Sequence, residues 1–295
     1  MGKEKRPLLI LLILLALVLA GGIWWLEEVK KGPSAPQKPG EEGGSPQEDE
    51  AVSPSPPAPL PEGQQEATEP KPSRGSPRIA IIIDDLGYNG QNYRPFLDIR
   101  YPLTFAVLPS LPYSKRIARE ATGRGREVLL HLPLEPHDYP SRDPGRGLIS
   151  SSMDEEEMRQ VFEEDLRSVP GAVGVNNHMG SRMMEDPEAM KILLRELKRR
   201  NLYFVDSLTT NRTAAPALAR EMGIKCGRRK VFLDNYQDRS YIESQLQALT
   251  ESARSKGGAI GVGHPYAITA AVLREQLPRL EQEGIRLVPA SQLVR

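Results

Sequence analysis

The sequence has few of the residues that define several common protein classes. It holds a single cysteine, Cys226, among 295 residues, so no intrachain disulfide can form. It has no excess charge of either sign, because 39 Lys and Arg residues balance 39 Asp and Glu residues. Aromatic residues make up 5% of the chain and are not interleaved with a basic stripe. A fold held together by disulfides is therefore excluded, and no nucleic-acid partner is expected.

One apolar run near the start of the chain is long enough to cross a lipid bilayer. It covers residues 7–26, follows three basic residues and contains no charge. At about 1.5 Å per residue it spans a bilayer core of about 30 Å, and the basic flank should stay in the cytoplasm. Residues 1–26 are therefore predicted to be an uncleaved membrane anchor; a cleaved signal peptide, with Ala20-Gly21-Gly22 as the cleavage site, is the alternative. Either segment would export the rest of the chain. We expect an extracytoplasmic protein, in the periplasm or at the cell surface, that a single N-terminal helix tethers to the cytoplasmic membrane.

Residues 27–77 contain few aliphatic side chains. Pro, Glu, Gly, Ser and Gln dominate this segment. Such a composition cannot bury enough apolar surface to offset the entropy of ordering the backbone, so a disordered linker is predicted. The folded domain is predicted to occupy residues 78–295, where aliphatic runs become frequent.

The predicted folded domain alternates short aliphatic runs with helical patterns. Uninterrupted aliphatic runs are typical of strands buried on both faces, which usually belong to a parallel sheet. About eight such strands with helices between them predict either a (β/α) barrel or a doubly wound sheet. The predicted strands are Ile79–Ile83, Leu103–Leu108, Glu127–Leu130, Ala172–Val175, Leu202–Val205, Lys230–Leu233, Ala259–Val262 and Arg286–Val288.

Helix start and stop signals separate these strands. Ser152 and Glu155 have the spacing of a capping box before one predicted helix. Asp186 and Pro187 supply a cap and a first-turn proline for the next helix. Gly257 is placed to end a later helix. These signals support a regular alternation of strands and helices.

Polar side chains gather where the predicted strands end. Asp84 and Asp85 follow the first strand. Three of the four histidines, His131, His178 and His264, follow later strands. In both architectures the carboxyl ends of the strands form the functional rim, so these side chains are expected to converge. A bound cation would relieve repulsion between the adjacent aspartates, and imidazoles are common ligands of such a cation. The combination predicts a metal site, although each residue alone could be a helix cap or a structural histidine.

Other polar residues on this rim are candidates for contact with a substrate. Asp206 follows a strand and would either join the site or cap the next segment, and Asn177 would bind substrate or serve an ordinary turn. Glu135, four residues after the first strand-end histidine, is the third candidate. His137 lies in the following loop and is expected at the surface. The basic segment Arg228–Lys230 is expected before a strand and therefore on the opposite rim, which disfavours a phosphoesterase.

Four of the strand ends carry longer motifs. They are Ile82-Ile83-Asp84-Asp85-Leu86-Gly87, His131-Leu132-Pro133-Leu134-Glu135-Pro136, Asn177-His178-Met179-Gly180-Ser181 and Gly261-Val262-Gly263-His264-Pro265. In this order they resemble the motifs of the divergent polysaccharide deacetylase family, a branch of the polysaccharide deacetylase superfamily. The resemblance covers the predicted folded domain and none of the anchor or linker. It implies a distorted (β/α) barrel with about seven parallel strands, and the metal-dependent removal of acetyl groups from N-acetylated sugars.

The resemblance also implies residue roles. Asp84 would be the general base and Asp85 a metal ligand. His131 matches the first histidine of the superfamily's second motif, but Glu135 stands where that motif has its second histidine. His178 would then supply the missing nitrogen ligand. Glu135 would be an alternative ligand, or a partner that orients a histidine.

The chemistry expected from this resemblance is hydrolysis of an acetamido group. His264 matches the late-strand histidine that acts as general acid. Two imidazoles and one carboxylate suit zinc, so the expected cofactor is a divalent metal of that kind. The ion would lower the pKa of its bound water toward about 7, and this water would attack the acetyl carbonyl. We expect a metal-dependent deacetylase acting on N-acetylated cell-envelope polysaccharide. The alternative is an inactive barrel that keeps the metal groove and binds glycan or an envelope protein.

Overall fold

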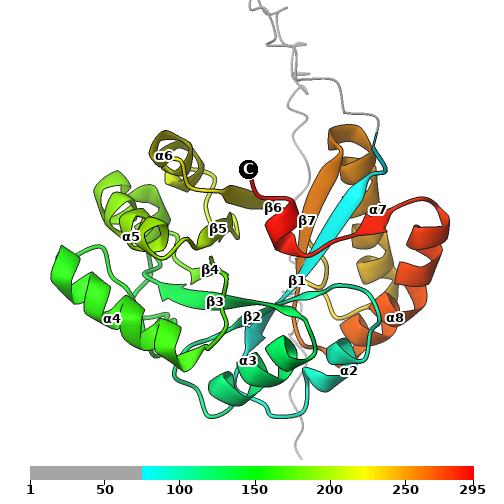
Figure 1. Ribbon diagram of the computed structural model, residues 1–295, viewed down its shortest axis with the longest axis horizontal. Coiled ribbons are helices and arrows are strands. Elements are labelled where there is room, and N and C mark those ends of the chain that lie inside the picture. The colour runs from blue at the N-terminus through cyan, green and yellow to red at the C-terminus, as the bar shows by residue number, and fades with distance from the viewer. Residues whose placement is uncertain (1–74) are drawn as a thin grey trace, which may run out of the picture. The chain divides into compact units, whose positions relative to one another are not determined.

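The computed structural model describes residues 75–295, in which strands and helices alternate from end to end (Figure 1). The predicted anchor 1–26 and most of the predicted linker 27–77 lie outside the described residues. Within residues 75–295, no helix combines the length and apolar character needed to cross a membrane. The strands are β1 (Arg78–Leu86), β2 (Thr104–Val107), β3 (Glu127–Leu134), β4 (Gly174–Met179), β5 (Tyr203–Asp206), β6 (Cys226–Phe232), β7 (Gly258–Gly263) and β8 (Arg286–Leu287). The helices are α2 (Arg94–Leu97), α3 (Ser114–Gly123), α4 (Glu155–Ser168), α5 (Pro187–Arg199), α6 (Ala215–Met222), α7 (Arg239–Lys256) and α8 (Ala267–Gln282), with short 3-10 turns η1 (Met183–Glu185) and η2 (Ala290–Gln292).

Strand β1 closes the sheet into a barrel because it is hydrogen-bonded along both edges. One edge pairs with β7 from Arg78 to Ile83. The other edge pairs with β2 toward its carboxyl end and with the short β8 at its amino end. The strands from β2 to β7 follow in sequence order, all parallel. Seven parallel strands thus form a closed barrel with the helices around its outside (Figure 1). The barrel prediction is confirmed, and the doubly wound alternative is wrong because an open sheet would leave two free edges.

All eight predicted strands are present, but several run further than their aliphatic residues indicate. β1 extends to Leu86, β3 to Leu134 and β4 to Met179. The aspartates and two of the histidines therefore lie within strands rather than after them. The prediction for Arg228–Lys230 is wrong, since these residues belong to β6 and do not precede it. A strand in contact with both neighbours tolerates charged residues wherever their side chains find a partner.

The helix boundaries follow local capping chemistry. The box before α4 is formed by Asp154 and Glu157, so the prediction of Ser152 and Glu155 is two residues too early. Asp154 fits better because its carboxylate accepts from the Glu157 N–H while Glu157 accepts from the Asp154 N–H. Asp186 caps α5 and Gly257 ends α7 in the left-handed conformation, as predicted.

The barrel has two apolar cores because successive strand residues face opposite sides of the sheet. Ile79, Ile81 and Ile83 of β1 point outward into the large core shared with the helices. The alternate residues point inward and fill the amino-end half of the barrel, which we call the lower interior. The C-terminal segment after β8 adds side chains to this cluster and closes that end. Its buried members are Ala80, Ile82, Ala106, Leu129, Tyr203, Val205, Ile260, Val262, Val288, Ala290 and Val294.

The same alternation determines what stands above this apolar layer. Two positions beyond Ile82 the inward residue of β1 is Asp84, and two beyond Leu129 the inward residue of β3 is His131. Two beyond Val262 the chain reaches His264, just after β7. We call this carboxyl-end half the upper interior; its side chains are Asp84, His131, Asn176, His178, Arg229 and His264. The fold therefore stacks a polar layer directly on an apolar one.

Candidate active site

The two adjacent aspartates share one mouth of the barrel because β1 is irregular at this point. In a regular strand Asp84 and Asp85 would face opposite sides. The register of β1 against β2 shifts between Ile83 and Leu86, and Asp85 adopts a left-handed conformation with φ 57°. Such a bulge re-aims a side chain, and a non-glycine residue in this region costs about 1–3 kcal/mol. The strain falls on a predicted metal ligand.

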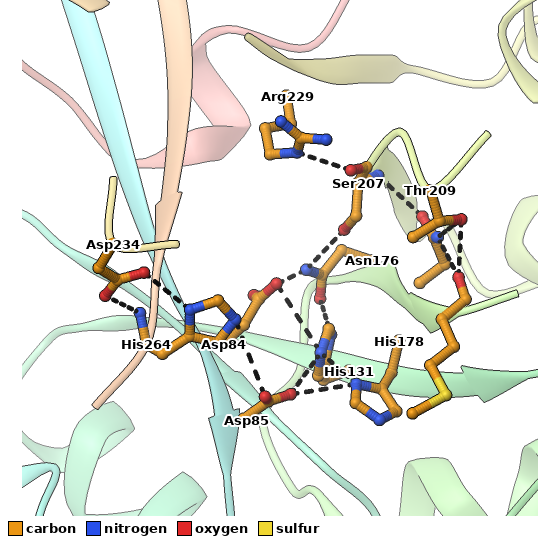
Figure 2. Close-up of polar contacts among 12 residues, drawn as sticks. Asp84, Asp85, His131, Asn176, His178, Ser207, Thr209, Arg229, Asp234 and His264 are labelled. Carbon is orange, nitrogen blue, oxygen red and sulfur yellow. Dashed lines mark hydrogen bonds and ion pairs between the residues drawn. The ribbon is translucent and has the colours of Figure 1, made fainter. Parts of the chain in front are cut away.

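Three predicted ligands bring their donor atoms together above the bulge (Figure 2). Asp85 Oδ1 lies 3.1 Å from His131 Nε2 and 3.1 Å from His178 Nδ1. The two ring nitrogens are also 3.1 Å apart. Ligands at about 2.0–2.1 Å from a tetrahedral zinc ion lie roughly 3.3 Å from one another, so the triangle has the size of such a site. The Asp85 side chain is 36% exposed, which leaves one side of the triangle open to solvent.

A hydrogen-bond chain fixes which nitrogen of His131 faces the triangle. Asn176 donates from Nδ2 to Asp84 Oδ1 at 2.8 Å, so its amide oxygen is the atom 3.0 Å from His131 Nδ1. His131 Nδ1 must then carry the proton, and Nε2 presents its lone pair to Asp85 and His178. Three electron-pair donors facing one point repel one another unless a proton or a cation lies between them. The donor set therefore fits a divalent ion.

The pKa values of Asp85 and His131 also indicate that the triangle favours a positive charge. Burial alone would raise the pKa of Asp85, but hydrogen bonds from His131 and His178 hold it well below its usual range. Burial alone would lower the pKa of His131, but Asp84 and Asp85 raise it to about 9. The site attracts a positive charge, which can be a proton on His131 or a metal ion in its place.

Asp84 is a buried carboxyl beside the triangle, 3% exposed. Its Oδ2 lies 3.7 Å from His131 Nε2, and its Oδ1 accepts from Asn176. Burial raises the pKa of Asp84, and the neighbouring His131 opposes this shift without cancelling it. A carboxyl group in this state can accept a proton more readily than an ordinary aspartate.

His264 faces the triangle from the opposite side and is held by Asp234 (Figure 2). Asp234 Oδ1 lies 2.8 Å from His264 Nδ1, and Oδ2 accepts from the His264 N–H and from the Thr269 hydroxyl. His264 Nε2 is thereby directed at the site, 3.8 Å from Asp85 Oδ2. Burial alone would lower the pKa of His264, but the Asp234 carboxylate raises it.

Arg229 brings a positive charge into the upper interior. Its guanidinium donates to the carbonyl oxygens of Ser207 and Leu208 and lies 3.6 Å from the centre of the Phe232 ring. The Phe232 ring in turn stacks on His264 at 5.9 Å. Burial lowers the pKa of Arg229, and Asp84 is one of two carboxylates that oppose this. Arg229 therefore balances part of the charge of the aspartates.

The remaining sequence candidates do not join the triangle. Glu135 is buried under the loop after β3, where it accepts from Ser150, Ser151 and Arg182. Burial would raise the pKa of Glu135, but these hydrogen bonds lower it.

Asn177 and Asp206 also use their polar atoms within the protein. Asn177 donates to Met179 O and accepts from the Ser207 N–H, which ties β4 to the segment after β5. Asp206 accepts from the Leu208 N–H and caps the chain after β5. Its neighbour Phe204, two positions earlier, belongs to the outer core, so Asp206 faces away from the barrel mouth. Of the two roles left open for Asp206, its placement favours the cap.

The roles of three functional side chains were not predicted from the sequence. Asp234 follows a predicted strand and could have been found by the rule that found the histidines. Asn176 was visible as a strand-end asparagine but not as the link between His131 and Asp84. Arg229 carried no signal, because its segment was misplaced relative to β6. His137, expected at the surface, is about half exposed and pairs with Glu185 away from the triangle.

The fold and the site define a (β/α) barrel hydrolase-type scaffold with a candidate metal centre at the carboxyl ends of its strands. Residues 81–294 match the divergent polysaccharide deacetylase family. The chain belongs to that family, as the motifs indicated, and has a deacetylase-type fold.

Three relatives support this assignment. Escherichia coli K12 YibQ, described as uncharacterized, is 37% identical over 74% of this chain and 67% of its own length. An uncharacterized Haemophilus influenzae protein is 32% identical over 74% of this chain and 77% of its own length. The crystal structure of the uncharacterized Agrobacterium tumefaciens protein ATU2773 superposes with a TM-score of 0.72 at 25% identity, covering 76% of this chain and 92% of that one. These proteins establish the family and the fold, and none of them carries an assigned activity.

Proposed function

We propose that this protein is a metal-dependent hydrolase that removes acetyl groups from N-acetylated cell-envelope polysaccharide. The observation that carries the proposal is the triangle of Asp85, His131 and His178 donor atoms, 3.1 Å apart, with a carboxyl group and an imidazole beside it. A binding site for a metal alone gives no reason to place both Asp84 and the Asp234-held His264 around it.

The metal ligands in this proposal are Asp85, His131 and His178, with zinc as the cofactor because the set is one oxygen and two nitrogens. When bound, a divalent ion polarises the acetyl carbonyl and makes water at the site more acidic. Asn176 orients His131 through Nδ1, which keeps Nε2 free for the ion.

Asp84 and His264 divide the proton transfers. Asp84 takes a proton from the attacking water, and its raised pKa suits it for this step. His264 Nε2 gives a proton to the amine nitrogen as the C–N bond breaks, because a neutral amine leaves more easily than an amide anion. Asp234 holds His264 Nδ1 and favours the charged imidazolium that this step needs.

The proposed location of the protein outside the cytoplasm supports cell-envelope glycan as the class of substrate. The uncharged apolar run at residues 7–26 with a basic flank supports export and tethering to the cytoplasmic membrane. An exported deacetylase-type barrel meets cell-envelope glycan, and N-acetylated polymers carry the bond that this site would hydrolyse.

The test combines metal content with acetate release. Purified protein is analysed for bound metal and assayed on N-acetylglucosamine oligomers and peptidoglycan with added zinc, cobalt or manganese. Asp85→Ala and His178→Ala should each lose the metal and the activity. His137→Ala is the matched control, because this histidine lies outside the triangle and should keep both.

Two outcomes would contradict the proposal in different ways. Unchanged metal content in both ligand variants would remove the metal site. Full metal loading with no acetate release from any substrate would instead favour a glycan-binding barrel without turnover.

A further inference from the structure

Exposed aromatic side chains gather on the rim that carries the candidate site. Among residues 75–295, the large apolar side chains with high exposure are Tyr88 at 61%, Tyr139 at 39%, Val173 at 46% and Tyr236 at 69%. The three tyrosines lie in loops that follow β1, β3 and β6, whereas Val173 lies just before β4. In a parallel barrel all loops that follow strands are at one end, so the tyrosines share the rim of the triangle and Val173 lies at the other end.

Tyr88 follows Asp85 closely in the sequence and lies beside the loop that carries Tyr139. Tyr88 is three residues after Asp85, so the two Cα atoms are at most about 11 Å apart. Its hydroxyl lies beside Gly145, 3.6 Å from where a Cβ atom of that residue would stand, in the loop that also carries Tyr139. We call Tyr88 and Tyr139 the first tyrosine arm.

The second tyrosine arm is Tyr236. It comes two residues after Asp234, the residue that holds His264, so the two Cα atoms are at most about 8 Å apart. Its ring packs edge-on against Tyr241 at 5.0 Å, which fixes one side and leaves the rest in solvent. β3 and β6 are each two strands away from β1, in opposite directions around the barrel. The two arms therefore flank the aspartates of β1 on two sides.

The chemistry of a tyrosine ring indicates what covers these arms. Among residues 75–295, all three large aromatic side chains with high exposure lie on this one rim, and exposed apolar side chains that gather on one face are typical of a binding surface. A pyranose ring presents a face of C–H bonds and an edge of hydroxyls. A tyrosine matches it with an apolar face and a hydroxyl at its tip.

We infer that Tyr88, Tyr139 and Tyr236 bind sugar residues on both sides of the one being deacetylated, so that the protein acts on internal residues of a glycan chain. This inference rests on the proposed function and specifies where along the polysaccharide the protein acts. A monosaccharide would bind at the active site beside the triangle without contacting both arms.

The test separates binding from turnover by chain length. KM and kcat for acetate release are measured with an N-acetylglucosamine pentasaccharide and with the monosaccharide. Tyr88→Ala and Tyr236→Ala should each raise KM for the pentasaccharide about tenfold, the effect of one lost aromatic contact, and leave kcat unchanged. KM for the monosaccharide should not change. Tyr88→Phe and Tyr236→Phe keep the ring and should retain most of the affinity, and Val173→Ala is the control at the far end.

A binding measurement keeps the two hypotheses distinguishable. Calorimetry with the pentasaccharide on Asp84→Asn, with and without Tyr236→Ala, reports affinity without turnover. Tenfold weaker binding combined with no acetate release from the unaltered protein would support glycan binding by the tyrosine arms and contradict both the proposed function and the action on internal residues. Acetate release with equal KM for both substrates, unaffected by the tyrosine variants, would overturn the inference and leave the proposed function intact.

Discussion

The lower and upper halves of the barrel interior are built from the same strands and the same inward-facing positions, yet they differ completely in chemistry. Ile82 and Asp84 are two residues apart on β1 and are both buried. Ile82 packs in an apolar cluster that needs no hydrogen-bond partner. Asp84 requires Asn176 and His131 around it. The comparison shows that the backbone determines which way a side chain points. The residue type then determines whether that side chain contributes to stability or to the chemistry of the site.

The two halves also differ in backbone regularity. β1 keeps an unbroken register against β7 from Arg78 to Ile83, beside the lower interior. At the upper interior β1 bulges at Asp85. Met179, the last residue of β4, and Leu208, two residues after β5, also have left-handed backbone conformations. Strain of this kind persists only where the surrounding structure compensates for it. The contacts of Asp85 with His131 and His178 belong to that surrounding structure.

The largest effect is expected when the carboxylate of Asp84 is removed, the upper residue of the pair Ile82 and Asp84. Asp84→Asn should reduce the rate of acetate release by a factor of about 10²–10⁴, the usual contribution of a general base. Bound metal should remain, because Asp84 is not one of the three ligands. The measurement is kcat on an acetylated oligosaccharide together with elemental analysis, and full activity in a metal-loaded variant would remove Asp84 from the mechanism.

Truncation of Ile82, two positions before Asp84 in the lower interior, should affect the stability of the protein and not its chemistry. Ile82→Ala leaves a cavity in the lower interior and should lower the free energy of unfolding by about 2–5 kcal/mol. Ile82→Val is the graded control, with an expected loss of about 0.5–1.5 kcal/mol. Denaturant unfolding measures both. Loss of metal from the folded Ile82→Ala protein would show that the two halves are coupled more tightly than we expect.

A smaller effect is expected from the removal of Asn176, which links His131 to Asp84. Asn176→Ala removes the acceptor that fixes His131 Nδ1 and should weaken metal affinity about 10–100-fold, as is typical for residues that orient a ligand. Competition with a chelator measures this affinity. Asn177→Ala is the neighbouring control; its amide ties β4 to the segment after β5, so it should lower stability more than metal affinity.

The smallest expected effect is a shift in pH dependence. His264 must be protonated to act as an acid, so kcat/KM should fall as pH rises through its pKa. Asp234 raises that pKa, and Asp234→Asn should therefore move the alkaline limb of the profile to lower pH. Measuring kcat/KM against pH with each protein tests this, and an unchanged alkaline limb would assign the acid role to another group.

Much of the fold could be predicted because it depends on local signals. The aliphatic runs located all eight strands, and Asp186 and Gly257 located helix ends. The site was accessible for a similar reason, since polar residues at strand ends stand out against an apolar background. Glu135 illustrates the limit of this reasoning: its spacing resembled that of a ligand, but a loop with Ser150 and Ser151 draws its carboxylate away from the triangle.

The sequence by itself determined the alternation of strands and helices, the family, and the residue types available to the site. These features follow from hydrophobic pattern and from short motifs, which require no knowledge of distant contacts. Only the tertiary structure decided that β1 pairs on both edges, that a bulge turns Asp85 toward the two histidines, and that Asp234, Asn176 and Arg229 support the site. Such relations join residues up to 208 positions apart and depend on how strands pack around one axis, which no local stretch of sequence encodes.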